Sequence, residues 1–202
     1  MVDQVLDIMV RELDSYIKSV NGVDSSATEP IVELGNIAGC KLAGSLESGV
    51  EQKVVVSLVN IAEESTLKNK MPGQQGGGGT FYEEYPPVHV NLYLLFTANF
   101  EKYNKAISHL FRVMEFFQGR KEFGLSDALF PAEHINEVNN LDPEDKILVE
   151  LHTLNFEQIN DLWGSLGGKQ MPFVLYRARL VPIRMQRRTG RAGVITEIEV
   201  NG

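Results

Sequence analysis

Apolar residues near the start of the chain recur at helical spacing. Between residues 2 and 20 they stand three and four positions apart: Val2, Leu6, Met9, Leu13, Tyr16 and Val20. Charged residues fill the positions between them, which is typical of an amphipathic helix that buries one face. The pattern therefore predicts a helix over residues 2–20, ended by Asn21-Gly22, with its apolar stripe in the core.

A second helical pattern runs from Asn99 to Gly119. An asparagine can cap the free N–H groups at the start of a helix, and a glycine is a common stop. We expect Asn99 and Gly119 in these two roles. The buried face is expected to carry these apolar residues: Phe100, Tyr103, Ile107, Leu110, Met114 and Phe117, with Phe111 beside them.

A third, shorter helix is expected in the stretch "FEQINDLWGSLGG". Asn155 and Gln158 just before and inside it form the N-x-x-Q variant of a capping box. Gly167-Gly168 are expected to end the helix. Its buried side is expected to consist of Phe156, Ile159, Leu162 and Trp163.

Two long apolar stretches predict neighbouring strands. Residues 53–62 are rich in β-branched side chains and apolar at both odd and even positions, as expected of a strand covered on both faces. Residues 88–97 also have a strand pattern, and consecutive strands usually pair. Further extended segments are expected at residues 31–34, 147–153, 171–180 and 193–200.

The order of these elements is helix, strands, helix, strands, short helix, strands. Strict alternation of strands and helices is missing, so we expect an α+β fold. This fold would be a mixed or antiparallel sheet packed by two long helices and one short helix. A length of 202 residues suits one domain, residues 1–202, with its own core.

A glycine-rich segment precedes the strand at residues 88–97. A phosphate-binding loop would need convergent N–H groups, a following helix and a lysine. The chain has no Gly-Lys-Ser/Thr, and a strand follows instead. We therefore expect a flexible surface loop at residues 72–80, containing Gly73, Gly76, Gly77, Gly78 and Gly79.

The distribution of charge indicates a protein-docking surface. A net charge of −8 argues against nucleic acid as a partner. Residues 177–191 nevertheless hold six arginines and no acid, whereas residues 1–176 hold 25 acids and 13 bases. No apolar run approaches the ~20 residues of a membrane segment, and the first ten residues do not match a secretory signal.

The sequence contains no recognisable set of reactive groups. The four histidines lie far apart and form no H-E-x-x-H pattern, and no G-x-S-x-G elbow occurs. The single cysteine, Cys40, belongs to no nucleophile motif and is expected to be a small buried residue. We therefore expect no catalytic residue, no metal site, no cofactor and no enzyme activity. The histidines are His89, His109, His134 and His152.

Three longer stretches together resemble a known family. They are "VLDIMVRELDSYI", "PPVHVNLYLLFTANFEKYNKAISHLFRVMEFFQ" and "LHTLNFEQINDLWGSLGGKQMPFVLYRARLVPI". The chain resembles the tail-cap, or tail terminator, family of phage-tail-like contractile injection systems. The resemblance covers nearly the whole chain and is most specific at residues 87–118 and 151–179.

The resemblance implies a structural role rather than catalysis. Members of this family form a ring, expected to be a homohexamer, that ends the inner tube and the sheath at the distal tip. The implied partners are further copies of the chain, the inner-tube protein and the sheath protein. Assembly would be cytoplasmic, in a particle that can be released from the cell.

A C-terminal extended arm, residues 189–202, is the candidate joint. Unpaired main-chain groups of such an arm can complete a neighbour's sheet, and arginines can bind acidic faces of tube or sheath. A solvated strand end explains the same arginines equally well. The alternative function is a non-enzymatic binding or adaptor module for a small ligand or a cargo protein. The candidate interface residues are Arg184, Arg187, Arg188, Arg191, Ile195 and Ile198.

Overall fold

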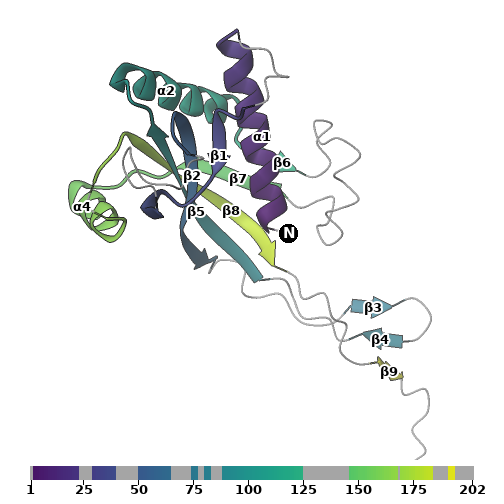
Figure 1. Cartoon of the computed structure of the whole chain (residues 1–202). Coiled ribbons are helices and arrows are strands. Elements are labelled where there is room, and N and C mark those ends of the chain that lie inside the picture. Colours follow the sequence, from purple (N-terminus) through teal and green to yellow (C-terminus); the bar gives the residue numbers. More distant parts are fainter. Residues whose placement is uncertain are drawn as a thin grey trace, which may run out of the picture.

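The fold is α+β, as predicted, with a mixed six-stranded sheet and three α-helices in the described part of the chain (Figure 1). The computed structural model describes residues 2–22, 29–39, 50–64, 74–76, 80–82, 88–124, 146–167, 169–183 and 191–193. Cys40 and His134 lie outside these ranges.

The first helix has the predicted bounds, but Val20 at the end of the predicted stripe is 40% exposed. α1 spans Val2–Val20, and the turn at Asn21 and Gly22 follows it. Leu6, Met9 and Leu13 of the predicted stripe are buried. The other two helices are α2, Tyr103–Gly119, and α4, Phe156–Ser165, and a short 3-10 helix, η1, spans Ile37–Gly39.

The predicted cap of α2 is wrong, although its end at Gly119 is confirmed. Asn99 is the last residue of a strand and pairs with Lys53. Its side-chain amide donates to the carbonyl of Val50 at 3.0 Å, so it is engaged at the sheet. α2 begins three residues after the position that a cap at Asn99 would require, and its N-cap residue, Lys102, makes no side-chain cap.

The buried face of α2 is also rotated from the predicted one. Tyr103 and Phe111 are 68% and 59% exposed, whereas Leu110 and Phe117 are buried as predicted. Ala106 packs against Ala98 of the sheet, and two alanines allow a close approach. The buried residues are Ala106, His109, Leu110, Val113 and Phe117.

The capping box of α4 is confirmed. The side chain of Asn155 accepts from the N–H of Gln158 at 2.8 Å, and the side chain of Gln158 accepts from the N–H of Asn155 at 2.9 Å. Trp163 is buried as predicted, whereas Phe156 is 91% exposed. Phe156 stands about two turns before Trp163 on the same side of α4 but is left uncovered.

The large sheet has the strand order β1-β2-β5-β8-β7-β6. β1 is parallel to β2 and all other neighbours are antiparallel, which makes the sheet mixed. The predicted pairing of residues 53–62 with 88–97 is confirmed. The strands are β1, Val32–Leu34; β2, Lys53–Glu63; β5, Val88–Asn99; β6, Glu122–Gly124; β7, Lys146–Leu151; and β8, Phe173–Ile183.

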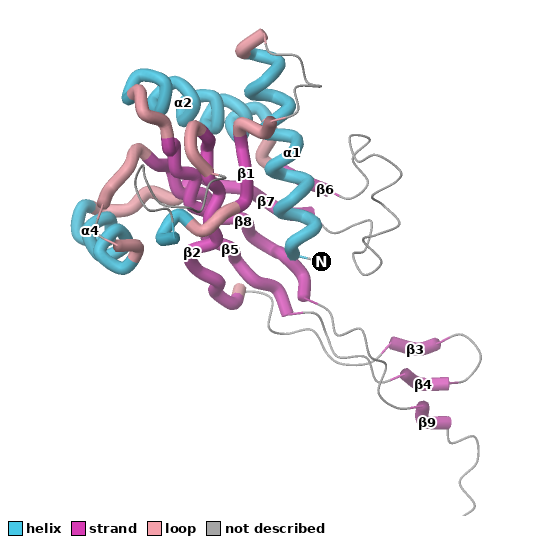
Figure 2. Tube along the Cα trace, in the orientation of Figure 1, coloured by secondary structure: helices cyan, strands magenta, loops and turns pink. Residues whose placement is uncertain are grey.

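Each face of the large sheet carries its own core (Figure 2). Successive side chains of a strand point to opposite faces, so Leu94 and Leu95 of β5 belong to different cores. α1 and α2 pack on the Leu94 face, where Leu13 and Val113 are completely buried. α4 packs on the Leu95 face through Trp163. The helices α2 and α4 therefore flank the sheet on opposite sides.

A second, three-stranded sheet lies off the end of the large one (Figure 1). Its strands have the order β3-β4-β9 and are all antiparallel. They are β3, Gln74–Gly76; β4, Thr80–Tyr82; and β9, Arg191–Gly193.

Candidate assembly interface

The two sheets are made by the same three passages of chain in the same order. The chain runs from β2 to β3, from β4 to β5 and from β8 to β9. β2, β5 and β8 are neighbours in the large sheet, and β3, β4 and β9 are neighbours in the small one. The three central strands thus leave the large sheet and pair again beyond it. We call β3, β4 and β9 the arm sheet.

Each of the three passages has a connecting segment between its strand in the large sheet and its strand in the small one. Glu63 pairs with Val90 in the large sheet and Gln74 with Tyr82 in the arm sheet. Between these two paired positions, the first passage has 10 residues, 64–73, and the second passage has 7 residues, 83–89. Ile183 pairs with Val88 and Arg191 with Tyr82, so residues 184–190 correspond to residues 83–87, 7 against 5.

The arm sheet is too small to supply its own stability. Each of its strands has three residues, and isolated sheets need longer strands or a packed apolar face. Both of its outer strands, β3 and β9, are edge strands, whose free main-chain groups can accept another strand. A surface of this kind suits a contact with another protein.

The structure places only some of the predicted site residues. Gly76 belongs to β3 and pairs with Thr80, while Gly73, Gly77, Gly78 and Gly79 lie outside the described residues. Arg191 begins β9 and pairs with Tyr82. The remaining interface candidates lie outside the described residues: Arg184, Arg187, Arg188, Ile195 and Ile198.

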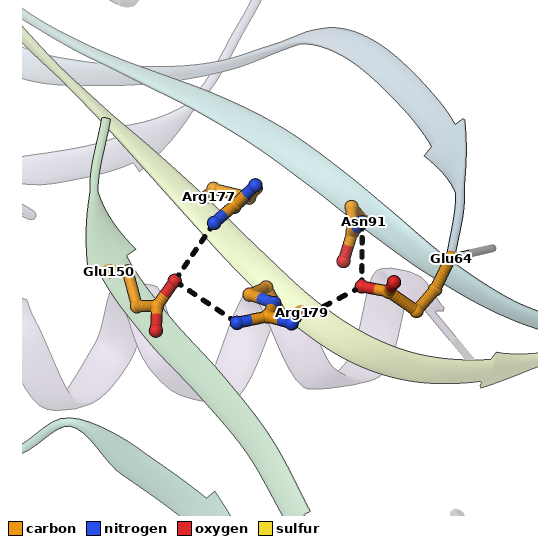
Figure 3. Close-up of polar contacts among 5 residues, drawn as sticks. All are labelled: Glu64, Asn91, Glu150, Arg177 and Arg179. Atoms are coloured by element: carbon orange, nitrogen blue, oxygen red, sulfur yellow. Dashed lines mark hydrogen bonds and ion pairs between the residues drawn. The ribbon is translucent and has the colours of Figure 1, made fainter. Parts of the chain in front are cut away.

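A polar network ties together the strands that lead to the arm sheet (Figure 3). Glu64 follows β2, and its carboxylate accepts from the amide of Asn91 in β5 at 3.1 Å. The same carboxylate lies 3.5 Å from the guanidinium of Arg179 in β8. Glu64 is largely buried, so these contacts are shielded from solvent.

Arg177 and Arg179, the first two residues of the arginine-rich stretch, are neutralised within the chain. The carboxylate of Glu150 in β7 lies 3.0 Å from Arg177 and 3.5 Å from Arg179. The hydrogen bond from Arg177 holds the pKa of Glu150 below its usual value, while the same bond raises the pKa of Arg177. The charge asymmetry of the sequence therefore overstates the positive charge of this stretch.

No sequence pattern indicates this network, because its members come from four separate parts of the chain. Glu64 and Glu150 lie 115 and 27 residues from their respective partners Arg179 and Arg177. No local motif marks such pairs. The alternation of strand residues is the one available signal, since Arg177 and Arg179 share a face.

The described histidines are not gathered into a reactive site. His109 is buried in α2, where it stacks on Phe100 at 4.4 Å and its Nδ1–H donates to the carbonyl of Lys105. His152 contacts the ring of Tyr93 edge-on at 5.2 Å. Among the described residues, no three His, Cys, Asp or Glu side chains come together in a way that could hold a metal ion. None of the described helices is long and apolar enough to span a bilayer.

Two solved structures have a similar fold. One is the PVC sheath/tube terminator of an extracellular contractile injection system in its extended state, seen by cryo-EM. It is 14% identical, the match covers 100% of this chain and 63% of that chain, and the TM-score is 0.58. The other is the tube-terminating cap of the anti-feeding prophage, 15% identical, with 74% of this chain and 49% of that chain covered and a TM-score of 0.51.

These similarities place the fold with that of tail terminators. The chain belongs to the Pvc16 N-terminal domain family, which it matches over residues 4–197. The predicted resemblance to tail terminators is thereby confirmed. The chain spans less than two thirds of the length of either solved relative. No curated protein sequence matches it.

Proposed function

We propose that this chain is a structural cap that ends the inner tube and sheath of a contractile injection particle. The observation that carries the proposal is the match of its entire length to a sheath/tube terminator. Membership in the Pvc16 N-terminal domain family supports the same role. The chain acts by binding protein surfaces and not as an enzyme, and it works without a cofactor.

The cap is a ring of copies, six in number if it follows the sixfold order expected of the tail. Each copy contacts the last layer of inner-tube subunits and the last layer of sheath subunits. A ring that meets the tube on one side and ends it on the other needs unlike surfaces on each subunit. Assembly takes place in the cytoplasm, and the finished particle can leave the cell.

The chain functions in this ring as one terminator-like domain, residues 1–202, with a projecting arm. The projecting position of the arm sheet in Figure 1 and its open edges support a docking role for the arm. The glycines next to β3, at positions 73, 77, 78 and 79, let the arm adapt to its partner, and residues 189–202 extend the contact. Arg184, Arg187, Arg188 and Arg191 bind acidic faces of tube or sheath, with Ile195 and Ile198 beside them.

The proposal is tested by building the particle with and without this chain. The tube, sheath and baseplate proteins of the same system are expressed together, and the particles are imaged by cryo-EM. With the chain present we expect tubes of uniform length that end in a ring. Particles that keep a uniform length and the same end density without the chain would show that another protein is the cap.

A second experiment tests the arginines separately. The variant Arg187→Glu with Arg188→Glu is expected to lower the fraction of capped particles. The effect should be strongest at low salt, because salt screens the interaction between exposed charges. Capping at the normal level in moderate salt would rule out the arginines as a docking surface and leave the cap role intact.

A further inference from the structure

The outer edge of β2 is open over the half of the strand that leads toward the arm sheet. β1 pairs with residues 54–56 of β2, and its chain then leaves the strand direction in η1. The carbonyl of Gly35 accepts from the hydroxyl of Ser57 at 2.6 Å, which marks the last contact along this track. No other described strand pairs with the outer side of residues 58–62. Such an edge offers its main-chain groups to an added strand.

The register of the sheet shows which main-chain groups face outward. The carbonyl of His89 accepts from the N–H of Glu64 at 2.8 Å, so odd-numbered residues at this end of β5 bond toward β2 and even-numbered ones toward β8. Leu58 and Ile61 pair with even-numbered residues of β5. The N–H and C=O groups of Leu58 and Ile61 therefore point away from β5, into the open edge.

The side chains at this edge are apolar and lack the usual protection against pairing. Leu58 and Ile61 are 43% and 55% exposed, and they lie on the Leu94 face of the sheet. Natural edge strands commonly carry charged residues, above all lysine, or a proline, which prevent the addition of a further strand. Residues 57–62 contain neither a charged residue nor a proline.

The opposite edge at the same end of the sheet is blocked. β7 pairs with β8 only as far as Arg179, so residues 180–183 form an outer edge of the described sheet. Pro182 pairs with His89, which bonds toward β2, so the nitrogen of Pro182, which carries no hydrogen, faces the open side. Leu180 has a left-handed backbone, φ 64°, beside a bulge in the pairing with β5. Of the two edges, only that of β2 suits strand addition.

Residues 194–200 have a sequence that fits this edge. They follow β9 directly and read VITEIEV, which is rich in β-branched residues. In a strand, Thr196, Ile198 and Val200 share one face, and the two glutamates lie on the other. The first of these faces matches the apolar side chains on the Leu94 face of the β2 edge.

This segment starts from the side of the molecule that lies away from its own β2 edge. β4 lies between β9 and β3, and β5 lies between β8 and β2 (Figure 1). A strand that follows β9 must therefore pass β4 and β5 to reach the β2 edge of the same copy. A second copy can present its segment to this edge without crossing a strand. Such a contact between unlike surfaces repeats from copy to copy and forms a ring when the rotation closes.

We infer that residues 194–200 of one copy add as a strand to the β2 edge of a second copy. The added strand bonds to the outward main-chain groups of Leu58 and Ile61, and Ile198 packs beside their side chains. The arginines at positions 184–191 precede the added strand and stay available to tube or sheath. The inference rests on the proposed cap, because it names the contact that joins neighbouring subunits of its ring.

A charge at the open edge is expected to prevent this contact. Ile61→Lys gives the β2 edge the protection that natural edge strands carry. The matched control is Ile183→Lys on the blocked edge, where the side chain is 43% exposed. Both side chains are partly in solvent, so both variants should fold with nearly the urea midpoint of the wild type. Ile61→Lys is expected to lower the fraction of particles with a complete ring at least tenfold, and the control should leave it unchanged. Equal ring fractions for the two folded variants would overturn the inference.

A cysteine scan tests the contact directly on assembled particles. In a Cys40→Ser background, Ile61→Cys is combined in turn with a cysteine at each position from 195 to 200. Under mild oxidation we expect a ladder of linked chains with at least one of Thr196→Cys, Ile198→Cys and Val200→Cys. The positions between these three face the other side of the added strand and should give none. Ile183→Cys with Ile198→Cys is the control for the blocked edge and should also give no ladder.

The outcomes of the scan distinguish this contact from the cap role. A ladder at alternate positions supports strand addition at the β2 edge. Capped particles that give no ladder, or an equal ladder at every position, would show that residues 194–200 do not add to this edge, and the cap role would stand. Wild-type particles that lack the chain at their ends would show that the cap role is wrong, and the inference would fail with it.

Discussion

The carboxylate of Glu64 lies 3.5 Å from the guanidinium of Arg179, although Glu64 follows β2, Arg179 belongs to β8, and β5 separates these two strands. Asn91 of β5 lies between them and donates to the same carboxylate. These two contacts join the end of β2 with β5 and β8, at the end of the large sheet from which the chain continues toward the arm sheet. They hold the three strands together at that end of the large sheet.

Replacing Arg179 with alanine is expected to lower the free energy of unfolding by about 1–3 kcal/mol. The change removes a cation from the buried Glu64 carboxylate and from Glu150. The matched control is Arg112→Ala, which removes an exposed ion pair on α2 and should cost about 0–1 kcal/mol. Urea unfolding monitored by tryptophan fluorescence measures both, and equal losses would contradict a special role for the Glu64 network.

Asp14 joins α1 to the edge of the sheet, and its loss should be more severe. One carboxylate oxygen accepts from the N–H groups of Ile31 and Val32 at 2.6 and 3.0 Å, and the other lies 2.8 Å from the buried ammonium of Lys18. Asp14→Ala is expected to destabilise the fold by about 3 kcal/mol. Asp7→Ala, which removes an exposed pair with Arg11, is the control. A loss below about 1 kcal/mol for Asp14→Ala would show that the N–H groups find other partners.

Asn155→Ala should destabilise α4 by about 1 kcal/mol, because the N–H of Gln158 loses its acceptor. Asn155→Ser keeps a capping oxygen and is expected to recover most of that loss. Hydrogen exchange of the α4 amides measures the effect locally. Equal protection in the wild type and the alanine variant would mean that the cap contributes little and that packing of Trp163 holds the helix.

His109 is expected to make stability depend on pH. Burial lowers its pKa from the usual 6.5, so the unfolded chain takes up a proton more readily than the folded one. The stability contributed by neutral His109 is present above pH 6.5 and is lost as the pH falls from there through the lowered folded-state pKa. Urea midpoints of the wild type and of His109→Gln, measured from pH 8 to pH 5, test this. A Gln variant with the same pH slope would assign the dependence to other groups.

The amphipathic and capping patterns of the sequence predicted local structure well. The stripe of α1 and the capping box at Asn155 depend on neighbours within a few residues, so they are visible in the sequence itself. The pairing of β2 with β5 was also accessible, since both strands are strongly apolar and close in sequence.

Features that depend on distant contacts were predicted incorrectly or not at all. The buried face of α2 includes Ala106, which clusters with Ala98 of the sheet, and small residues give little signal in an apolar pattern. Phe156 is apolar and correctly spaced, but it is 91% exposed. The Glu64–Arg179 pair joins residues 115 positions apart, which no local rule detects.

The shared order of the two sheets limits how the arm can vary in length during evolution. A residue inserted in the segment 64–73 and passed on into β3 would slide β3 along β4 by one position and turn its side chains to the opposite face. A longer or shorter arm therefore requires compensating insertions or deletions in three segments that are far apart in the sequence: 64–73, 83–87 and 184–190. Such coordinated length changes would leave a trace in the sequences of relatives, with gaps at the three sites appearing together.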